Sequence, residues 1–183
     1  MKTQVNIRLR KGVLLSGALM LLACGIGPQG THPSRNAMDQ DPKNPYYSRT
    51  DTSTLHVSDA EWQRVLPDSV YRIAREKGTE RAFTGKYWDF EGLGTYYCAV
   101  CGNPLFRSDS KFGSGCGWPS FFAPIRPNSV HYQRDVTYGM VRTEVLCGRC
   151  GSHLGHVFDD GPPPTGKRFC MNSIVLEFEP DEH

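Results

Sequence analysis

Three features are scarce in this 183-residue chain, and each scarcity excludes a class of protein. The main apolar run, Val13–Leu22, is far shorter than the roughly 20 residues that a membrane-spanning helix needs. Basic residues are scattered, so nothing indicates the concentrated basic face that nucleic-acid binding usually requires. Internal repeats are absent apart from two short cysteine motifs, which favours one ordinary domain.

The first 24 residues have the pattern of an export signal. Basic residues precede the short apolar run, which is typical of a signal peptide, and the run ends in Leu21-Leu22-Ala23-Cys24. This ending resembles a bacterial lipobox, where cleavage leaves a lipid-bearing cysteine at the new N-terminus. The alternative is an ordinary signal peptide that contains a cysteine. We predict a lipoprotein signal peptide at residues 1–23 and lipid on Cys24 as the membrane attachment. The protein is then an exported, membrane-anchored lipoprotein of the bacterial cell envelope.

Charge and composition divide the rest of the chain. The predicted signal contains four of the 21 basic residues and none of the 19 acidic ones, so the remainder is slightly acidic. Residues 24–54 are rich in Gly, Pro, Asn, Ser, Thr and charges, which predicts a flexible tether whose one apolar pair is Tyr46-Tyr47. Residues 55–183, about 129 of them, are enough for one domain with its own core.

The domain pattern predicts short N-terminal helices followed by mainly antiparallel β-structure. Ser58 and Glu61 form a capping box at the start of one helix, and a second is expected from Pro67 to Gly78. Later segments are short and interrupted by Gly and Pro, as strands joined by turns are. The expected strands are Gly94–Cys98, Val130–Asp135, Thr137–Arg142, Glu144–Leu146 and Arg168–Phe178.

Two C-x-x-C motifs predict a metal site. Cys98 and Cys101 form the first, Cys147 and Cys150 the second, and glycine follows each, as in many zinc knuckles. The 45 residues between Cys101 and Cys147 are too many for a compact finger, so the fold must bring the motifs together. The alternative is two disulfides, which an exported protein can form. We predict zinc in a structural role, because four thiolates leave no open position for catalysis.

Cys170 lies in a segment that predicts a strand. Alternate side chains of a strand share one face, so Arg168 and Asn172 would flank the thiol with a guanidinium and an amide. A neighbouring cation lowers the pKa of a thiol and raises its thiolate fraction. The alternative is a cysteine buried in the core, the usual place of an unpaired one. The polar neighbours favour a reactive role.

Cys116 lies in a different setting, among Gly113, Gly115 and Gly117. Such a loop can carry a thiol toward a partner, whereas core packing holds a cysteine in place. Trp118 follows directly and predicts an apolar pocket wall, with plain core packing as the alternative.

The segment 151–161 places two histidines and two aspartates next to the second cysteine motif. His153 and His156 could be metal ligands, but four cysteines already fill a tetrahedral site. Acid–base or polar binding work is therefore the better use of these side chains.

Three long motifs resemble the methionine sulfoxide reductase B family. They are Gly-Cys-Gly-Trp-Pro-Ser-Phe at 115–121, Gly-Ser-His-Leu-Gly-His-Val-Phe-Asp-Asp-Gly-Pro at 151–162 and Arg-Phe-Cys-Met-Asn-Ser at 168–173. The segment 80–85 is a further match, with Ala82 where Pro is more usual, and the resemblance spans about residues 59–178. It implies a mainly β fold of two antiparallel sheets with a four-cysteine zinc site, within residues 55–183. It also implies reduction of the R epimer of methionine sulfoxide.

The resemblance implies a role for each matched residue. Cys170 would attack the sulfoxide sulfur and become a sulfenic acid, and Cys116 would resolve that acid as a disulfide. Trp118 would pack on the methyl group of the substrate. The residues expected to position or protonate the sulfoxide oxygen are His153, His156, Asp160, Arg168 and Asn172.

The resemblance also implies partners. They are methionine sulfoxide, in proteins or free, and thioredoxin or a thioredoxin-like reductant; we expect a monomer. Oxidised envelope proteins are the expected substrates, because the tether would hold the enzyme near them.

Two other classes of protein stay open. A zinc-ribbon binding module accounts for the C-x-x-C motifs but not for Cys116 and Cys170. A disulfide-stapled lipoprotein suits the compartment but not the histidine-rich segment.

Overall fold

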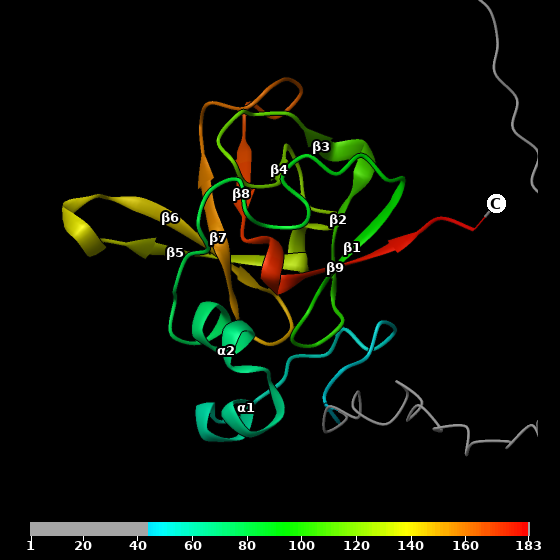
Figure 1. Ribbon diagram of the computed structural model, residues 1–183, viewed down its shortest axis with the longest axis vertical. Helices are drawn as coiled ribbons and strands as arrows, with labels where there is room; N and C mark the ends of the chain where they lie inside the picture. Colours follow the sequence, from blue (N-terminus) through cyan, green and yellow to red (C-terminus); the bar gives the residue numbers. More distant parts are fainter. Residues whose placement is uncertain (1–43, 183) are drawn as a thin grey trace, which may run out of the picture. The chain divides into compact units, whose positions relative to one another are not determined.

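A computed structural model describes residues 44–182, so the predicted signal peptide, Cys24 and the first part of the predicted tether lie outside the described residues. Two short helices, α1 (Asp59–Val65) and α2 (Asp68–Ala74), precede the strands (Figure 1). The first sheet has the order β2-β1-β9 and the second the order β3-β4-β8-β7-β6-β5, and every pairing is antiparallel. The predicted fold class is therefore confirmed.

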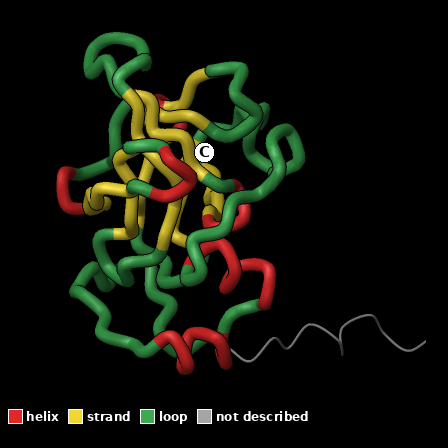
Figure 2. The backbone as a smooth tube through the Cα atoms, turned by 90° about the vertical axis from the view of Figure 1, so that its left-hand side faces the viewer, coloured by secondary structure: helices red, strands yellow, loops and turns green. Residues whose placement is uncertain are grey.

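The strands are short, and loops run between them (Figure 2). The first sheet consists of β1 (Gly94–Cys98), β2 (Pro104–Arg107) and β9 (Leu176–Pro180). The second consists of β3 (Lys111–Phe112), β4 (Ser120–Phe121), β5 (Val130–Asp135), β6 (Arg142–Cys147), β7 (His153–Phe158) and β8 (Arg168–Met171). Single 3-10 turns lie at Ser108–Ser110 (η2), Pro127–Ser129 (η3), Thr137–Gly139 (η4) and Ser173–Val175 (η5).

The N-terminal helices begin where the sequence predicts. The Ser58 hydroxyl accepts a hydrogen bond from the Glu61 amide and caps α1. However, α2 ends at Ala74 rather than at Gly78. Lys77 adopts a left-handed conformation (φ 57°), and the Gly78 amide donates to the Arg72 carbonyl. Gly78 thus closes the turn that follows the helix.

Two predicted strands are wrong in extent. Thr137–Arg142 is not a strand, because η4 makes the turn between β5 and β6, and Asp135 accepts from the Thr137 amide (2.9 Å). Arg168–Phe178 is two strands, because η5 separates β8 in one sheet from β9 in the other. β2, β3, β4 and β7 were not predicted. β7 contains both histidines of segment 151–161, for which the sequence predicted no strand.

Aromatic rings join the two sheets. Phe106 of β2 stacks on Phe121 of β4 with centroids 4.4 Å apart, and Phe106 also meets Phe169 of β8 at 5.7 Å. Along β8, Phe169 and Met171 are buried in this core, whereas Cys170 is half-buried. Each buried ring removes roughly 150–250 Å² from water. The core therefore fixes β8 and turns the Cys170 side chain away from it.

Residues 44–55, here called the N-terminal strap, lie on the domain. The Ser48 amide donates to the Cys101 carbonyl (3.0 Å), and the Leu55 amide donates to the Arg149 carbonyl (2.8 Å). Tyr46 packs edge-on against Trp62 at 5.1 Å. Residues 44–54, which the sequence assigns to the tether, therefore contact the domain in the part of the chain that the structure describes. No helix within residues 44–182 is long and apolar enough to cross a membrane.

Candidate active site and metal centre

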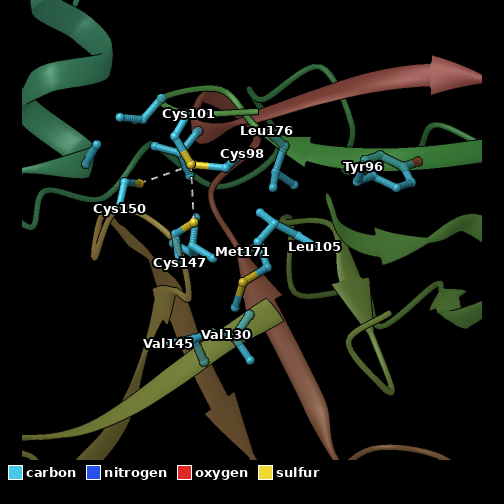
Figure 3. Packing of buried hydrophobic residues seen from close by; sticks show 14 of the residues in the cluster. Tyr96, Cys98, Cys101, Leu105, Val130, Val145, Cys147, Cys150, Met171 and Leu176 are labelled. Atoms are coloured by element: carbon cyan, nitrogen blue, oxygen red, sulfur yellow. Dashed lines mark hydrogen bonds between the residues drawn. The ribbon is translucent and has the colours of Figure 1, made fainter. Parts of the chain in front are cut away.

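The two C-x-x-C motifs meet in space. Cys98 Sγ lies 3.8 Å from Cys150 Sγ, and Cys101 Sγ lies 3.6 Å from Cys147 Sγ (Figure 3). All four side chains are buried, and their sulfurs lie within 4.8 Å of one another. No disulfide joins any of the six cysteines in residues 44–182.

This cluster fits a zinc ion. Tetrahedral zinc with Zn–S bonds of about 2.3 Å separates its sulfurs by about 3.8 Å, close to the distances seen here. Burial raises the pKa of the Cys98 and Cys147 thiols, so a cation is needed to hold them as thiolates. Cys98, Cys101, Cys147 and Cys150 would therefore hold the metal. It would join the end of β1 to the turn between β6 and β7.

The two remaining described cysteines form a separate pair. Cys116 Sγ lies 3.5 Å from Cys170 Sγ. Cys170 is held in the middle of the large sheet, opposite Ser120 of β4 and His156 of β7. A Cβ on Gly155 would lie 2.1 Å from the Cys170 carbonyl oxygen, so only glycine lets β7 approach β8 here.

Cys116 is held by a turn rather than by a strand. The next residue, Gly117, has φ +89°, a conformation that favours glycine. The Ser114 hydroxyl donates to Cys116 Sγ (2.9 Å), and Ser120 Oγ lies 3.5 Å from it. The loop thus presents a half-buried sulfur to Cys170.

The two thiols differ in acidity, in the direction opposite to our expectation. Burial raises the pKa of Cys170 to about 12, the Cys116 sulfur adds to this rise, and Arg168 only partly opposes it. For Cys116, hydrogen bonds from Ser114 and Ser120 outweigh burial and lower the pKa to about 7. Of the two thiols, Cys116 is therefore the more acidic, and Cys170 keeps its proton to higher pH. We had expected the cation beside Cys170 to prevail over burial.

A pocket of about 120 Å³ lies over Cys170. Ligand sites for drug-sized molecules are roughly 300–1,000 Å³, so this pocket has room for little more than one side chain. Trp118 forms one wall, and its indole N–H donates to the Glu80 carbonyl (3.2 Å). The other lining residues are Thr79, Arg142, Gly155, His156, Phe158, Cys170, Met171 and Asn172.

A larger cavity lies elsewhere. It has a volume of about 810 Å³ and is lined by residues that include Leu66, Val70 and Ile174. Neither Cys116 nor Cys170 lines it. Volume would favour this cavity, but chemistry favours the small pocket, because only the small pocket contains a thiol.

His156 belongs to an ion-paired group at the pocket. Its Nε2 lies 2.8 Å from Asp135 Oδ2, and the same oxygen accepts from the Arg142 guanidinium at 2.6 Å. Hydrogen bonds from Thr137, His156 and Arg142 hold the pKa of Asp135 well below its usual range. The sequence reasoning missed Asp135 and Arg142, which face each other across the ends of β5 and β6. Opposite charges flanking a Gly-containing turn were the available signal.

Of the other predicted site residues, Asn172 lines the pocket, whereas Arg168, Asp160 and His153 do not. Arg168 pairs with Asp160 through two hydrogen bonds (2.8 and 2.7 Å) and lies over the Phe158 ring. The Asn172 amide is bound to backbone, donating to the Leu154 carbonyl (3.0 Å) and accepting from the Glu80 amide (3.0 Å). His153 is buried behind the pocket rather than lining it.

Comparisons with known proteins agree with this arrangement. A family model described as the SelR domain matches residues 66–180. The chain is 58% identical over 125 residues to the peptide methionine sulfoxide reductase MsrB of Thiobacillus denitrificans, covering 68% of this chain and 95% of the relative. It is 58% identical over 126 residues to the protein of the same name from Agrobacterium fabrum, covering 69% and 93%. For the one from Acinetobacter baumannii, identity is 55% over 128 residues, covering 70% and 92%.

Proposed function

The chain belongs to the SelR (MsrB) family and is a peptide-methionine (R)-S-oxide reductase, and we propose that it acts through Cys170 and Cys116 on oxidised proteins of the cell envelope. The observation that carries the proposed chemistry is the 3.5 Å approach of Cys116 Sγ to Cys170 Sγ beneath a pocket the size of one side chain. Zinc, which the four buried cysteines fit, supplies stability when bound and leaves the reaction to the second cysteine pair.

The first step reduces the substrate. The Cys170 sulfur attacks the sulfoxide sulfur, the S–O bond breaks, and the oxygen passes to Cys170 as a sulfenic acid while methionine leaves. The sulfoxide oxygen gains a proton as its bond to sulfur weakens. His156, held by Asp135 at the pocket, is the donor that we assign to that proton.

Cys116 takes part before and after that step. Before it, the Cys116 thiolate at 3.5 Å can accept the proton that Cys170 must lose. After it, the Cys116 thiol attacks the Cys170 sulfenic acid, which forms the disulfide and releases water. An external dithiol reductant, thioredoxin or a thioredoxin-like protein, then restores both thiols.

The remaining residues shape and hold the pocket. The Trp118 ring supplies an apolar wall for the substrate methyl group, and its bond to the Glu80 carbonyl fixes the ring. Asn172 connects the Leu154 carbonyl to the Glu80 amide and so joins β7 to the segment that carries Thr79. Arg168, paired with Asp160, places a positive charge near the Cys170 thiol and lowers its pKa, against the larger effect of burial.

An assay with each epimer of methionine sulfoxide and a dithiol reductant tests the activity. We expect reduction of the R epimer and none of the S epimer, and a folded Cys170→Ser protein that reduces neither. Equal use of both epimers, or activity in Cys170→Ser, would overturn the proposal.

The location is tested separately. If Cys24 carries lipid, the wild-type protein partitions with membranes and Cys24→Ser does not, while the purified domains have the same activity. A Cys24→Ser protein that still partitions with membranes would contradict the anchor.

A further inference from the structure

A second histidine lies behind the one that faces the pocket. His153 Nδ1 is 2.7 Å from Glu144 Oε1, and Lys77 Nζ donates to Glu144 Oε2 at 2.8 Å. The ring centroids of His153 and His156 are 5.5 Å apart. Each histidine thus has a carboxylate with its own cation: Glu144 with Lys77 for His153, and Asp135 with Arg142 for His156.

The strand register places the second group directly behind the reaction. His156 of β7 lies opposite Cys170 of β8 on one side and opposite Glu144 of β6 on the other. Directly opposed residues of neighbouring strands share one face of a sheet. A change of charge at Glu144 or His153 is therefore felt at His156, which is the residue beside the thiol.

Burial separates the two histidines. The side chains of His153 and Glu144 are each 3% exposed, whereas His156 is 13% exposed. Burial lowers the pKa of His153, the hydrogen bond to Glu144 works in the opposite direction, and His156 and Lys77 lower it further. Arg75 of the neighbouring α2 is engaged elsewhere, with Asp59 and the Cys150 carbonyl. Burial disfavours the charged form of a titratable group, so the more deeply buried His153 is the ring that the structure keeps neutral.

We propose that Lys77 is a positioning residue: by neutralising Glu144 it keeps His153 uncharged, so that His156 alone carries the proton delivered to the sulfoxide oxygen. The inference rests on the proposed function, in which His156 is the donor. Lys77 adopts a left-handed backbone conformation (φ 57°) that is uncommon for a residue other than glycine, and its ammonium group meets Glu144 from the turn after α2. With Lys77 present, Glu144 can accept Nδ1–H of a neutral imidazole without drawing a second proton onto the ring.

Removal of Lys77 has a defined consequence. Within residues 44–182, the hydrogen-bonded partner that the buried Glu144 carboxylate then keeps is the His153 ring, and a buried carboxylate favours a cation beside it. The resulting imidazolium lies 5.5 Å from His156 and repels a second proton there.

NMR titration of the histidine rings in the zinc-bound protein tests this directly, in the parent and in Lys77→Met. We expect the midpoint of His153 to rise by about one pH unit in Lys77→Met, because one nearby cation is lost. The single-turnover rate with free methionine sulfoxide should then fall roughly three- to tenfold below that same midpoint, and match the parent above it. A rate profile that bends at the NMR midpoint is not expected of a purely structural role.

Three further variants make the test sharp. Lys77→Arg keeps the charge and should restore the parent midpoint and rate. Lys86→Met removes a lysine that lies over the Tyr87 ring and should change neither. In a Glu144→Gln background, Lys77→Met should no longer raise the His153 midpoint.

Particular outcomes overturn the proposal. An unchanged His153 midpoint in Lys77→Met, or a shift that Lys77→Arg does not reverse, shows that Lys77 does not act through charge. A shift that persists with Glu144→Gln shows that it does not act through Glu144. If the parent protein reduces no methionine sulfoxide, the proposed function fails, and the titration still decides whether Lys77 controls His153.

Discussion

Cysteine has two roles in this molecule, as a metal ligand and as a redox group. The two groups of cysteines differ little in the distances between their sulfurs. The metal cluster has Sγ–Sγ distances of 3.6 and 3.8 Å, and the redox pair 3.5 Å. The metal cysteines are buried, and each C-x-x-C turn is closed by a backbone bond, Gly102 to Cys98 (2.8 Å) and Gly151 to Cys147 (2.9 Å).

The redox pair has the opposite surroundings. Cys116 and Cys170 are half-buried. A Cβ on Gly113 or on Gly115 would meet no atom within 4 Å, whereas a Cβ on Gly117 would lie 2.9 Å from Ala82 and Phe83, so the loop is open before Cys116 and packed after it. The comparison shows that burial and the partners of a thiol, more than the distance between sulfurs, separate the metal cluster from the redox pair. Full burial among four sulfurs suits a metal, whereas partial burial beside hydroxyl groups suits thiol exchange.

The largest effect is expected at the metal cluster. Cys98→Ser removes one ligand, and the protein should lose its zinc and melt at a much lower temperature, because distant segments are no longer joined. Structural zinc binding is worth roughly 10–16 kcal/mol in small peptides, as much as the whole stability of a domain. Metal content by elemental analysis and calorimetric melting check this. Cys116→Ser, the matched control, should keep both; full stability of Cys98→Ser without metal would break the comparison.

Within the redox pair, substitution of each cysteine should block a different step of the reaction. Cys170→Ser should abolish even the first turnover while keeping zinc and melting temperature, because the attacking sulfur is gone. Cys116→Ser should complete a first turnover and then stop in an assay with thioredoxin, because no disulfide forms. Methionine release per enzyme in a burst experiment measures both. If Cys116→Ser releases no methionine at all, Cys116 is more than the resolving residue.

Substitutions of two pocket residues should have different effects, one on the reaction rate and the other on substrate binding. His156→Gln should slow sulfenic acid formation about 100-fold, because it removes the proton donor. Trp118→Ala should instead raise the substrate concentration needed for half-saturation roughly tenfold, because an apolar contact with the substrate is lost. Single-turnover rates over a range of substrate concentrations distinguish them. Parent-like rates in His156→Gln together with normal binding in Trp118→Ala would place the wrong residues in the pocket.

The smallest effect is expected in the pH dependence of Cys170 alkylation. This dependence tests whether the charge on Cys116 raises the pKa of Cys170. The pKa of Cys170 is raised to about 12 by burial and then by the Cys116 sulfur. Removing a neighbouring negative charge favours the thiolate, so the pKa of Cys170 should fall in Cys116→Ser, and alkylation should begin at lower pH. Cys116→Asp keeps a negative charge and should leave alkylation at high pH. The measurement is the alkylation rate of Cys170 against pH by mass spectrometry, and equal profiles for the two variants would contradict the coupling.

How far the sequence could predict the structure depended on whether the relevant signal was local. The C-x-x-C motifs, the helix cap at Ser58 and the strands at Gly94–Cys98 and Val130–Asp135 are local patterns, and the structure contains them. The fold class followed from the same short segments. The contact between Asp135 and His156 was not predictable in this way, because it depends on the pairing of β5, β6 and β7.

The acidity of Cys170 shows the same limit. A cation two residues away is visible in the sequence, whereas the burial of β8 depends on packing against Phe106 of the first sheet, which lies far away in the sequence. The strap was missed for a related reason. Its composition is that of a tether, and what holds it is backbone bonding to the cysteine turns together with Arg149, whose guanidinium donates to the Tyr46 carbonyl (2.7 Å) and to Asp51 (2.9 Å).

The strap also determines where a mechanical pull would enter the domain. Its hydrogen bonds end on the turns that carry Cys101 and Arg149, on Glu61 and on β9. A force on Asn44 would therefore reach those turns first, where the bonds of several backbone segments share it. The strand that carries Cys170 takes its own support from β4 and β7. A load on the strap therefore falls on bonds other than those that hold the Cys170 strand in its sheet.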